Sequence, residues 1–340
     1  MLNLKRKNRA GVIGGGSWGT AFAIHLSSLN IETFLWIREP EVYKEAVKSR
    51  ENKTFLPGYI FPGKLNPSND LKNVVLNSQL IFIAVPSQYC REIYQSIAPY
   101  IGKNKIIVSL TKGIEKKSLK TMSQVMEEIF NYDILHNLAV LSGPSFALEV
   151  MKRHPTTVVI ASKNKRVAQF IQKTISSYYF RPYINDDIIG VELAGALKNV
   201  IAIAAGIVDG LGYGMNSLAA LVTRGLAEMT RLGIKLGASP QTFSGLAGMG
   251  DLILTCFGKL SRNRYVGYEL GKGKKINEIT SKMKMVAEGI NTTWSAYQLA
   301  KREKVEMPII EKVYEIIYEN KSPGKAVEEL MSRKLKEEFQ

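Results

Sequence analysis

Cysteine and histidine are scarce in this chain, whose 340 residues contain two cysteines and three histidines. Cys90 and Cys256 lie far apart and give no disulfide framework, which predicts a reducing compartment, the cytoplasm. Neither has the spacing of a metal-ligand motif, so we expect no metal site. A histidine acid or base is also poorly supported, since His25 falls in an expected helix, His136 in a link and His154 before a proline.

Long apolar runs are missing as well. The most apolar stretch, residues 200–208, is too short to cross a bilayer and follows Lys198. The basic residues 1–9 resemble the start of a signal peptide, but a strand pattern and a glycine-rich loop follow them, with no cleavage pattern. We therefore expect a soluble cytoplasmic protein without a membrane-spanning segment.

Acidic residues are outnumbered, with 46 lysines and arginines against 30 aspartates and glutamates, a formal net charge of +16. Such a surplus is compatible with nucleic acid, an acidic membrane surface or anionic small molecules as partners. The lysines are scattered, as in residues 163–166 and 272–275, without interleaved aromatic residues or a nucleic-acid motif. A generally lysine-rich surface explains them better, and we expect no nucleic-acid partner.

No low-complexity linker and no internal repeat divides the chain, yet it is too long for one ordinary core. Strand-like runs alternate with helical segments up to Asp187, which predicts parallel βαβ units and a doubly wound sheet. Helical patterns alone follow. We expect an α/β protein with a Rossmann-type domain in residues 1–188, closely packed on an all-α substrate-binding domain in residues 189–340. The expected strands are residues 11–13, 33–37, 80–85, 105–110, 138–141 and 157–160, and the expected helices beyond them are residues 189–207, 216–232, 239–246, 262–272, 292–303 and 308–318.

A glycine-rich loop follows the first expected strand and opens a helix. It has the spacing G-x-G-x-x-G, with Gly14 for the tight turn, Gly16 for close approach of a pyrophosphate and Gly19 for packing of the helix on the sheet. The helix N-terminus would face the phosphates with free N–H groups. Glycine loops alone are weak evidence, because turns use glycine whatever they bind. Between a strand and a helix, this loop predicts a dinucleotide site.

The position that reads the adenosine ribose lies at the tip of the next strand and carries Arg38. A guanidinium there can meet a 2′-phosphate or lie across the adenine ring. We therefore expect NADP(H) to be accepted, while the neighbouring Glu39 leaves NAD open. The other interpretation of this segment is a solvated turn.

Two lysines are candidates for the chemistry of a carbonyl. Lys198 lies among apolar residues of an expected helix, where desolvation would bring its pKa toward neutrality, as a proton donor or acceptor requires. Lys112 follows a strand at the carboxyl edge of the sheet, where a cation can polarise a carbonyl and assist Lys198. The alternatives are a lysine snorkelling from a helix surface and a solvated loop lysine.

Other polar residues follow glycine-flanked turns. Asp251, expected in a turn, would orient a lysine or bind a substrate hydroxyl, or else cap a helix. In the turn after a strand, Gly143 and Ser145 offer a backbone N–H and a hydroxyl to substrate. Residues 261–263, Ser-Arg-Asn, combine a guanidinium with two neutral hydrogen-bonding groups, a phosphate-binding set that also reads as an ordinary helix start.

Four motifs in order resemble the NAD(P)-dependent glycerol-3-phosphate dehydrogenase family of the bacterial type, and the likeness covers nearly the whole chain. They are the glycine loop through Thr20, Ser-Gly-Pro-Ser-Phe-Ala at residues 142–147, Glu-Leu-Ala-Gly-Ala-Leu-Lys-Asn at residues 192–199, and Leu-Ala-Gly-Met-Gly-Asp-Leu at residues 246–252 followed by Ser-Arg-Asn. The resemblance implies reversible hydride transfer between NAD(P)H and dihydroxyacetone phosphate. The product would be sn-glycerol 3-phosphate for phospholipid synthesis, and the enzyme a homodimer.

The resemblance also implies roles for individual residues. Lys198 would accept the proton in glycerol phosphate oxidation, and Lys112 would touch both cofactor and substrate. Ser261, Arg262 and Asn263 would bind the substrate phosphate, together with substrate contacts from Gly143, Ser145 and Asp251. The implied cofactor-binding residues are Gly14, Gly16, Ser17, Trp18, Gly19, Arg38, Lys112, Ala147, Arg262, Val286 and Glu288.

Three other functions compete with this one. A β-hydroxyacid-type dehydrogenase would share the two-domain plan but act on a substrate without phosphate, against which residues 261–263 argue. A dinucleotide-sensing regulatory protein would need neither Lys112 nor Lys198. A basic nucleic-acid binder would show a salt-dependent mobility shift.

Overall fold

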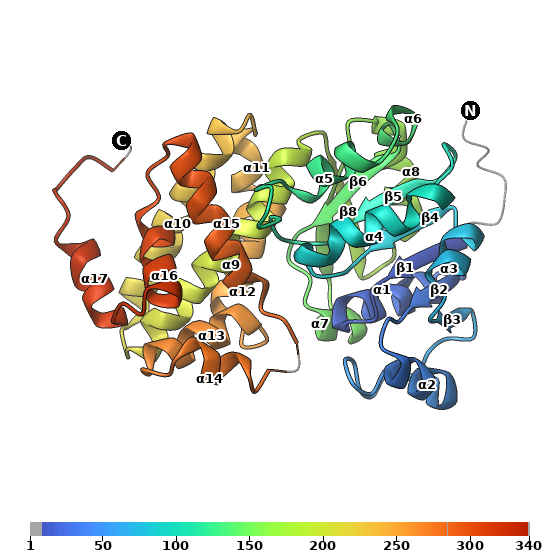
Figure 1. Ribbon diagram of the computed structural model, residues 1–340, viewed down its shortest axis with the longest axis horizontal. Coiled ribbons are helices and arrows are strands. Elements are labelled where there is room, and N and C mark those ends of the chain that lie inside the picture. The colour runs from blue at the N-terminus through green and yellow to red at the C-terminus, as the bar shows by residue number, and fades with distance from the viewer. Residues whose placement is uncertain (1–8, 284, 339–340) are drawn as a thin grey trace.

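Eight strands form one sheet in the computed structural model, which describes residues 9–283 and 285–338 (Figure 1). The strand order is β3-β2-β1-β4-β5-β6-β7-β8. Neighbours pair in parallel except β6 with β7, so β7 and β8 run opposite to the other six. The strands are β1 (Arg9–Ile13), β2 (Glu32–Trp36), β3 (Leu65–Ser68), β4 (Leu80–Ile83), β5 (Ile106–Ser109), β6 (Leu138–Ser142), β7 (Thr156–Ala161) and β8 (Phe180–Asn185).

Helices cover both faces of the sheet, as a doubly wound fold requires. The apolar side chains of α1, α2, α7 and α8 share one buried cluster with the sheet, and those of α3 to α6 share the cluster on the opposite face. The helices are α1 (Ser17–Ser28), α2 (Pro40–Ser49), α3 (Leu71–Asn77), α4 (Cys90–Ile97), α5 (Met122–Ile129), α6 (Tyr132–Leu135), α7 (Ala147–Met151) and α8 (Lys165–Ile175), with the short turns η1 (Ser87–Tyr89) and η2 (Ala98–Tyr100).

His25 holds two of these helices together. Its Nδ1 lies 2.7 Å from the Tyr179 hydroxyl and its Nε2 lies 2.8 Å from the Ile175 oxygen at the end of α8. Burial lowers the pKa of the imidazole to about 4. It is a neutral packing residue, and it does not line the polar cleft described below.

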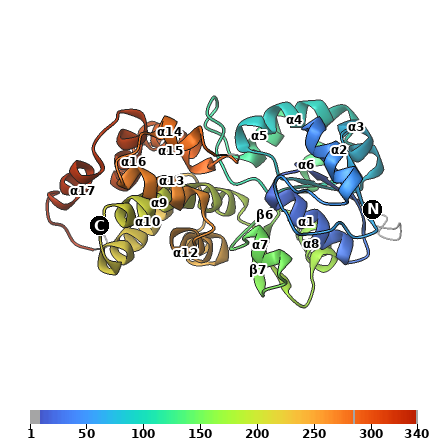
Figure 2. The same cartoon turned by 90° about the horizontal axis from the view of Figure 1, so that it is seen from below.

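The remaining chain is helical and stands beside the sheet domain (Figures 1 and 2). Its centre is α9 (Ile188–Gly210), which by length and composition alone is able to cross a membrane. Most of α9 is buried against its neighbours, however, so it is the core helix of this domain. The neighbours are α10 (Met215–Lys235), α11 (Pro240–Ser244), η3 (Leu246–Gly250), α12 (Asp251–Phe257), α13 (Arg262–Gly271), α14 (Ile276–Thr280), α15 (Glu288–Glu303), α16 (Pro308–Tyr318) and α17 (Pro323–Met331).

Glycines bring α9 and α13 into backbone contact. A Cβ atom at Gly206 would lie 2.0 Å from a backbone oxygen of α13, and one at Gly267 would lie 1.9 Å from a backbone oxygen of α9. Gly210 and Gly271 face each other at the next turn, where a Cβ on Gly210 would lie 3.0 Å from the Cα of Gly271. Any larger residue at these positions would push the two helices apart.

The expected fold class is confirmed, and the division near residue 188 stays a prediction. Two strands were not predicted, β3 and β8, and each contains a proline, Pro67 and Pro182. Both are edge strands, where the N–H that proline lacks is not needed for pairing with a further strand. The expectation of a parallel strand at residues 157–160 was wrong in direction, because only the short helix α7 separates β6 from β7 and the chain turns back instead of crossing over.

Candidate active site

The glycine loop forms an open cradle at the N-terminus of α1. Gly14 has φ +125°, and a Cβ there would lie 2.5 Å from the Ala84 oxygen; a Cβ at Gly19 would lie 1.9 Å from the Gly14 oxygen. A Cβ at Gly16 would meet nothing within 4 Å. Gly16 caps α1 without a side-chain hydrogen bond, so the helix presents its first N–H groups to open space. This loop therefore fits the diphosphate of a dinucleotide.

A cleft of about 440 Å³ runs from this loop to the helical domain. Its walls come from the carboxyl ends of β1, β2, β4 and β5 and from α9, α12, α13 and the segment before α15. Most of the expected site residues line it: Gly14, Gly16, Ser17, Trp18, Arg38, Lys112, Ser145, Lys198, Ser261, Arg262, Asn263, Val286 and Glu288. Gly19, Gly143, Ala147 and Asp251 do not line it.

Two lysines share one buried carboxylate at the floor of the cleft. Lys112 Nζ donates to Asp251 Oδ2 over 2.6 Å, and Lys198 Nζ donates to Asp251 Oδ1 over 2.9 Å. Asp251 is 1% exposed, and Lys198 also donates to the Thr255 hydroxyl over 2.7 Å. The carboxylate thus compensates one positive charge of two.

The ionisation of Lys198 reflects this environment. Burial lowers the pKa of its ammonium, the charge of Asp251 opposes that shift, Lys112 adds to it, and the pKa comes to about 8. Burial works against ionisation of Asp251, but the two lysine charges outweigh it and hold the pKa of this carboxyl below its usual range. A lysine with a pKa near 8 can both take up and release a proton near neutral pH.

Asp251 lies on the first turn of α12, not in the glycine-flanked turn expected from the sequence. Its carboxylate is occupied by the two lysines, and helix capping is not its role. Lys112 also donates to the Gly143 oxygen over 2.9 Å, which likewise accepts from the Ser145 hydroxyl over 2.9 Å. Gly143 therefore contributes to the site through its carbonyl.

The far end of the cleft, at the tip of β2, holds Arg38. Its guanidinium pairs with Glu39 at 2.9 Å and lies 5.3 Å from the centre of the Tyr89 ring. The Arg38 side chain is 60% exposed. A guanidinium held between an aromatic ring and open cleft is available to an adenine or to a phosphate on its ribose.

Residues 261–263 lie at the start of α13, and two of them, Ser261 and Asn263, make hydrogen bonds within the helical domain. The Ser261 hydroxyl accepts from the Arg264 N–H, which makes it the cap of this helix. Asn263 joins Asn199 and Gly289 through its amide, at 2.8 and 2.9 Å. Arg262 is exposed to the cleft.

The remaining expected residues lie where the two domains meet. Arg262 Nη1 donates to the Val286 oxygen over 2.8 Å. Glu288 accepts from the Ser87 N–H at 3.0 Å and hydroxyl at 2.7 Å, a contact from the helical domain to the sheet domain. Burial raises the pKa of the Glu288 carboxyl, although both Ser87 bonds favour its ionised form. The Ser17 hydroxyl similarly reaches Met285 Sδ at 3.1 Å.

Among the polar residues of the cleft that sequence reasoning missed are Asn199 and Thr255, together with Tyr89 and Thr111. Thr255 lies one helical turn after Asp251, the spacing that puts two side chains on one face of a helix. Asn199 follows Lys198 directly, and no spacing rule marks it. Ala147 is the first residue of α7 and packs against the apolar cluster of α1, outside the cleft lining.

A doubly wound sheet with a phosphate-type glycine loop, joined to a helical domain that supplies a buried lysine of lowered pKa, is characteristic of dehydrogenases that use a dinucleotide. Residues 9–168 match the family described as NAD-dependent glycerol-3-phosphate dehydrogenase N-terminus, and residues 187–328 match its C-terminus. The chain belongs to the NAD-dependent glycerol-3-phosphate dehydrogenase family.

Individual relatives agree with this assignment. A glycerol-3-phosphate dehydrogenase (NAD(P)+) of Citrifermentans bemidjiense is 52% identical, over 96% of this chain and 98% of its own. One from a Thermoanaerobacter species is 49% identical, over 96% and 98%. The crystal structure of glycerol-3-phosphate dehydrogenase from Coxiella burnetii is 38% identical and superposes with a TM-score of 0.92, covering 96% of this chain and 99% of that one.

Proposed function

We propose that the protein interconverts dihydroxyacetone phosphate and sn-glycerol 3-phosphate with NAD(P)H or NAD(P)+. The observation that carries the proposal is the pair Lys112 and Lys198 on one buried carboxylate, in a cleft whose other walls are the glycine loop and Arg262. When bound, the nicotinamide supplies or accepts the hydride. The residues of this chain supply the proton and the binding of the phosphate.

Proton transfer falls to Lys198. As the ammonium, its Nζ donates a proton to the oxygen that becomes the hydroxyl; as the neutral amine, it removes that proton in the reverse reaction. Asp251 holds the Nζ atoms of both lysines, 2.6 and 2.9 Å from its oxygens. Lys112 stabilises negative charge that develops on the substrate oxygen.

The cofactor and the phosphate take the two ends of the cleft. The loop from Gly14 through Trp18 to Gly19 holds the diphosphate and Arg38 the adenosine end. Ala147 lies by the nicotinamide, and Val286 and Glu288 contact the cofactor. Ser261, Arg262 and Asn263, with Gly143 and Ser145, hold the substrate. The guanidinium of Arg262, which lines the cleft, is the cationic member of this set and the natural partner of the phosphate.

The proposed function is tested by following NAD(P)H oxidation with dihydroxyacetone phosphate and with dihydroxyacetone. We expect the phosphate to raise kcat/KM by at least about 100-fold, since a phosphate bound by arginine contributes about 3 kcal/mol or more. Equal turnover of both compounds would favour a dehydrogenase for unphosphorylated substrates. Binding of NAD(P)H without turnover of either would favour a dinucleotide sensor.

Replacing Arg38 by alanine is expected to raise the KM for NADPH more than that for NADH, because the guanidinium has a 2′-phosphate to bind only in NADPH. Steady-state kinetics with each cofactor measures the two effects. Arg181→Ala is the matched control, since Arg181 also lies over a tyrosine, 5.4 Å from the Tyr183 ring, on the far edge strand β8. Equal effects of Arg38→Ala on both cofactors would contradict this role.

Replacing Arg262 by lysine is expected to weaken binding of dihydroxyacetone phosphate by about 1 kcal/mol or more, a rise in KM of at least about fivefold, because an ammonium cannot make the bidentate contact. Arg302→Lys, at an exposed arginine near the end of α15, should leave KM unchanged. If Arg262→Lys leaves both KM and kcat/KM unchanged, another group binds the phosphate.

We also infer the setting of the enzyme. Both cysteines are free and buried, which supports a reducing cytoplasm, where the product would serve phospholipid synthesis.

Ile253 and Phe257 on α12 are 46% and 39% exposed, which supports a homodimer, testable by light scattering. We place the domain boundary at residue 188 and expect no nucleic-acid partner, which a mobility-shift assay at low salt tests.

A further inference from the structure

The segment that carries Lys112 continues into the helical domain. We call residues 111–121, between β5 and α5, the strap. Ile114 is fully buried in the apolar core of the helical domain, and its oxygen accepts from the Ser295 hydroxyl of α15 over 3.2 Å. The Lys116 ammonium lies 5.9 Å from the ring of Trp294 and 5.5 Å from that of Tyr318. The strap is thus attached to the helical domain just after Lys112.

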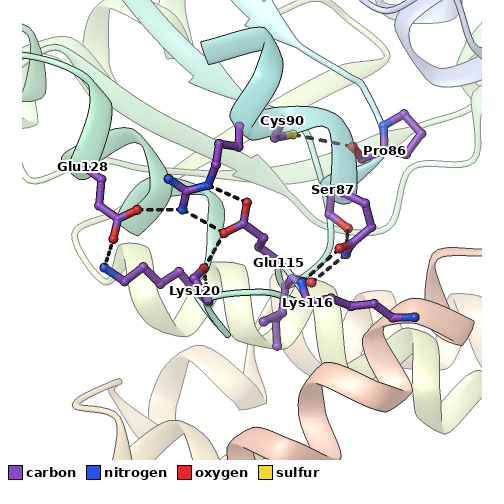
Figure 3. A network of polar contacts seen from close by, with 11 residues as sticks. Pro86, Ser87, Cys90, Glu115, Lys116, Lys120 and Glu128 are labelled. Carbon is purple, nitrogen blue, oxygen red and sulfur yellow. Dashed lines mark hydrogen bonds and ion pairs between the residues drawn. The ribbon is translucent and has the colours of Figure 1, made fainter. Parts of the chain in front are cut away.

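One side chain of the sheet domain holds the strap on both sides of Glu115. Gln88, in η1, donates from Nε2 to the Ile114 oxygen over 2.9 Å and accepts at Oε1 from the Lys116 N–H over 2.9 Å. Its Nε2 also lies 3.1 Å from the Ser87 hydroxyl, the group that binds Glu288. Figure 3 shows Ser87 and Lys116 joined through this network. A carboxamide is required here, because one end must donate and the other accept.

Neighbouring contacts leave the strap little room. Arg91 of α4 makes a bidentate pair with Glu115, with both distances 2.8 Å, and lowers the pKa of that carboxyl. A Cβ atom at Gly113, the residue after Lys112, would lie 2.4 Å from the Ser87 hydroxyl oxygen. The strap backbone is therefore pressed against η1, the element that carries Gln88.

We propose that Gln88 is a positioning residue of the reaction, whose carboxamide fixes the strap so that the Lys112 ammonium stays on Asp251 beside Lys198. Gln88 is absent from the residues that line the cleft, so it acts through the strap. This inference rests on the proposed function. It adds that the position of Lys112 depends on hydrogen bonds between the strap and η1, made by a side chain that does not line the cleft.

The test compares Gln88→Met, which removes the three hydrogen bonds with little change in bulk, and Gln88→Glu, which keeps the acceptor and replaces the donor. Gln172→Met is the matched control. Gln172, on the outer helix α8, likewise donates from its carboxamide to a backbone oxygen, that of Pro182, over 2.9 Å. Hydrogen exchange of the strap amides, without ligand, should be at least about tenfold faster in both Gln88 variants and unchanged in the control.

Kinetics give a second measurement. In both Gln88 variants we expect kcat for dihydroxyacetone phosphate to fall about tenfold while the dissociation constant of NADH changes less than twofold, since a displaced catalytic group lowers rate more than cofactor binding. The Lys112 charge helps to lower the pKa of Lys198, so its displacement should move the pH limb of glycerol 3-phosphate oxidation upward.

Each result decides something different. Wild-type enzyme that does not turn over dihydroxyacetone phosphate would refute the proposed function. The exchange data, taken without ligand, would still show whether Gln88 fixes the strap. Active wild type with unchanged strap exchange in the Gln88 variants would overturn the inference. So would a kcat and pH limb equal to those of wild type, or the same loss in Gln172→Met.

Discussion

Lys198→Met is expected to lower kcat by at least about 100-fold in both directions, the contribution of a general acid or base. Lys198 is buried at the floor of the cleft, and its Nζ donates hydrogen bonds to the Asp251 and Thr255 side chains. Methionine keeps most of the side-chain volume, so folding and NAD(P)H binding should survive.

The pH dependence shows which form of Lys198, neutral amine or ammonium, each direction of the reaction requires. Because the neutral amine is the base, kcat/KM for glycerol 3-phosphate oxidation should rise as pH increases through about 8, the pKa of Lys198. Reduction needs the ammonium, so its kcat/KM should fall over the same range. Both limbs should vanish in Lys198→Met.

The control for this variant is Lys235→Met, at an exposed lysine that ends α10. Thermal unfolding and a fluorescence titration with NADH should match wild type in both variants, while only Lys198→Met loses turnover. A folded, cofactor-binding Lys198→Met enzyme within a few-fold of wild-type kcat would refute the mechanism, and Lys112 would be the next residue to test.

Asp251→Asn should produce the second large effect, a fall in kcat of about 100-fold with a lower free energy of unfolding, by about 3 kcal/mol, because two ammonium groups lose their buried counter-charge. An amide offers one acceptor where the carboxylate offers two. Without the Asp251 charge, burial and Lys112 both lower the pKa of Lys198. The limb of the oxidation profile should therefore move to lower pH.

Urea unfolding and the pH profile of oxidation measure these two results. Asp209→Asn is the control, since Asp209 pairs with Arg264 over 2.7 Å on the same helix as Lys198 but is 40% exposed. An exposed pair contributes less than about 1 kcal/mol, and kcat should not change. An Asp251→Asn enzyme with an unmoved pH limb would show that the carboxylate does not set the ionisation of Lys198.

The parts of the fold that follow from local pattern were predictable. The central strands are continuous apolar runs, because a parallel sheet is buried on both faces. The helices α10 and α16 carry apolar residues at helical spacing. β3 and β8 were not predictable in this way, since Pro67 and Pro182 argue against a strand until the edge position is known. The reversal at β7 depends on how the chain turns after Ser142, which no propensity encodes.

The glycine loop followed from spacing, because its three glycines, each with its own steric requirement, lie within six residues. The contacts among Lys112, Lys198 and Asp251 were different: these residues come from the strap, α9 and α12, 53 to 139 positions apart. Sequence named each as a candidate but gave no means to see that one carboxylate serves both lysines. Gln88 carried no signal, since its two partners in the strap are backbone atoms, which any sequence provides.

The glycine contact between α9 and α13 has a consequence for selectivity among substrates. Lys198 lies on α9 and Arg262 begins α13, so the proton-transferring group and the proposed phosphate partner stand on two helices whose backbones touch at Gly206 and Gly267. Neither helix can approach the other further, and bulk between them would separate the two groups. We therefore expect this backbone contact to set which carbon-chain length between carbonyl and phosphate the proposed site accepts.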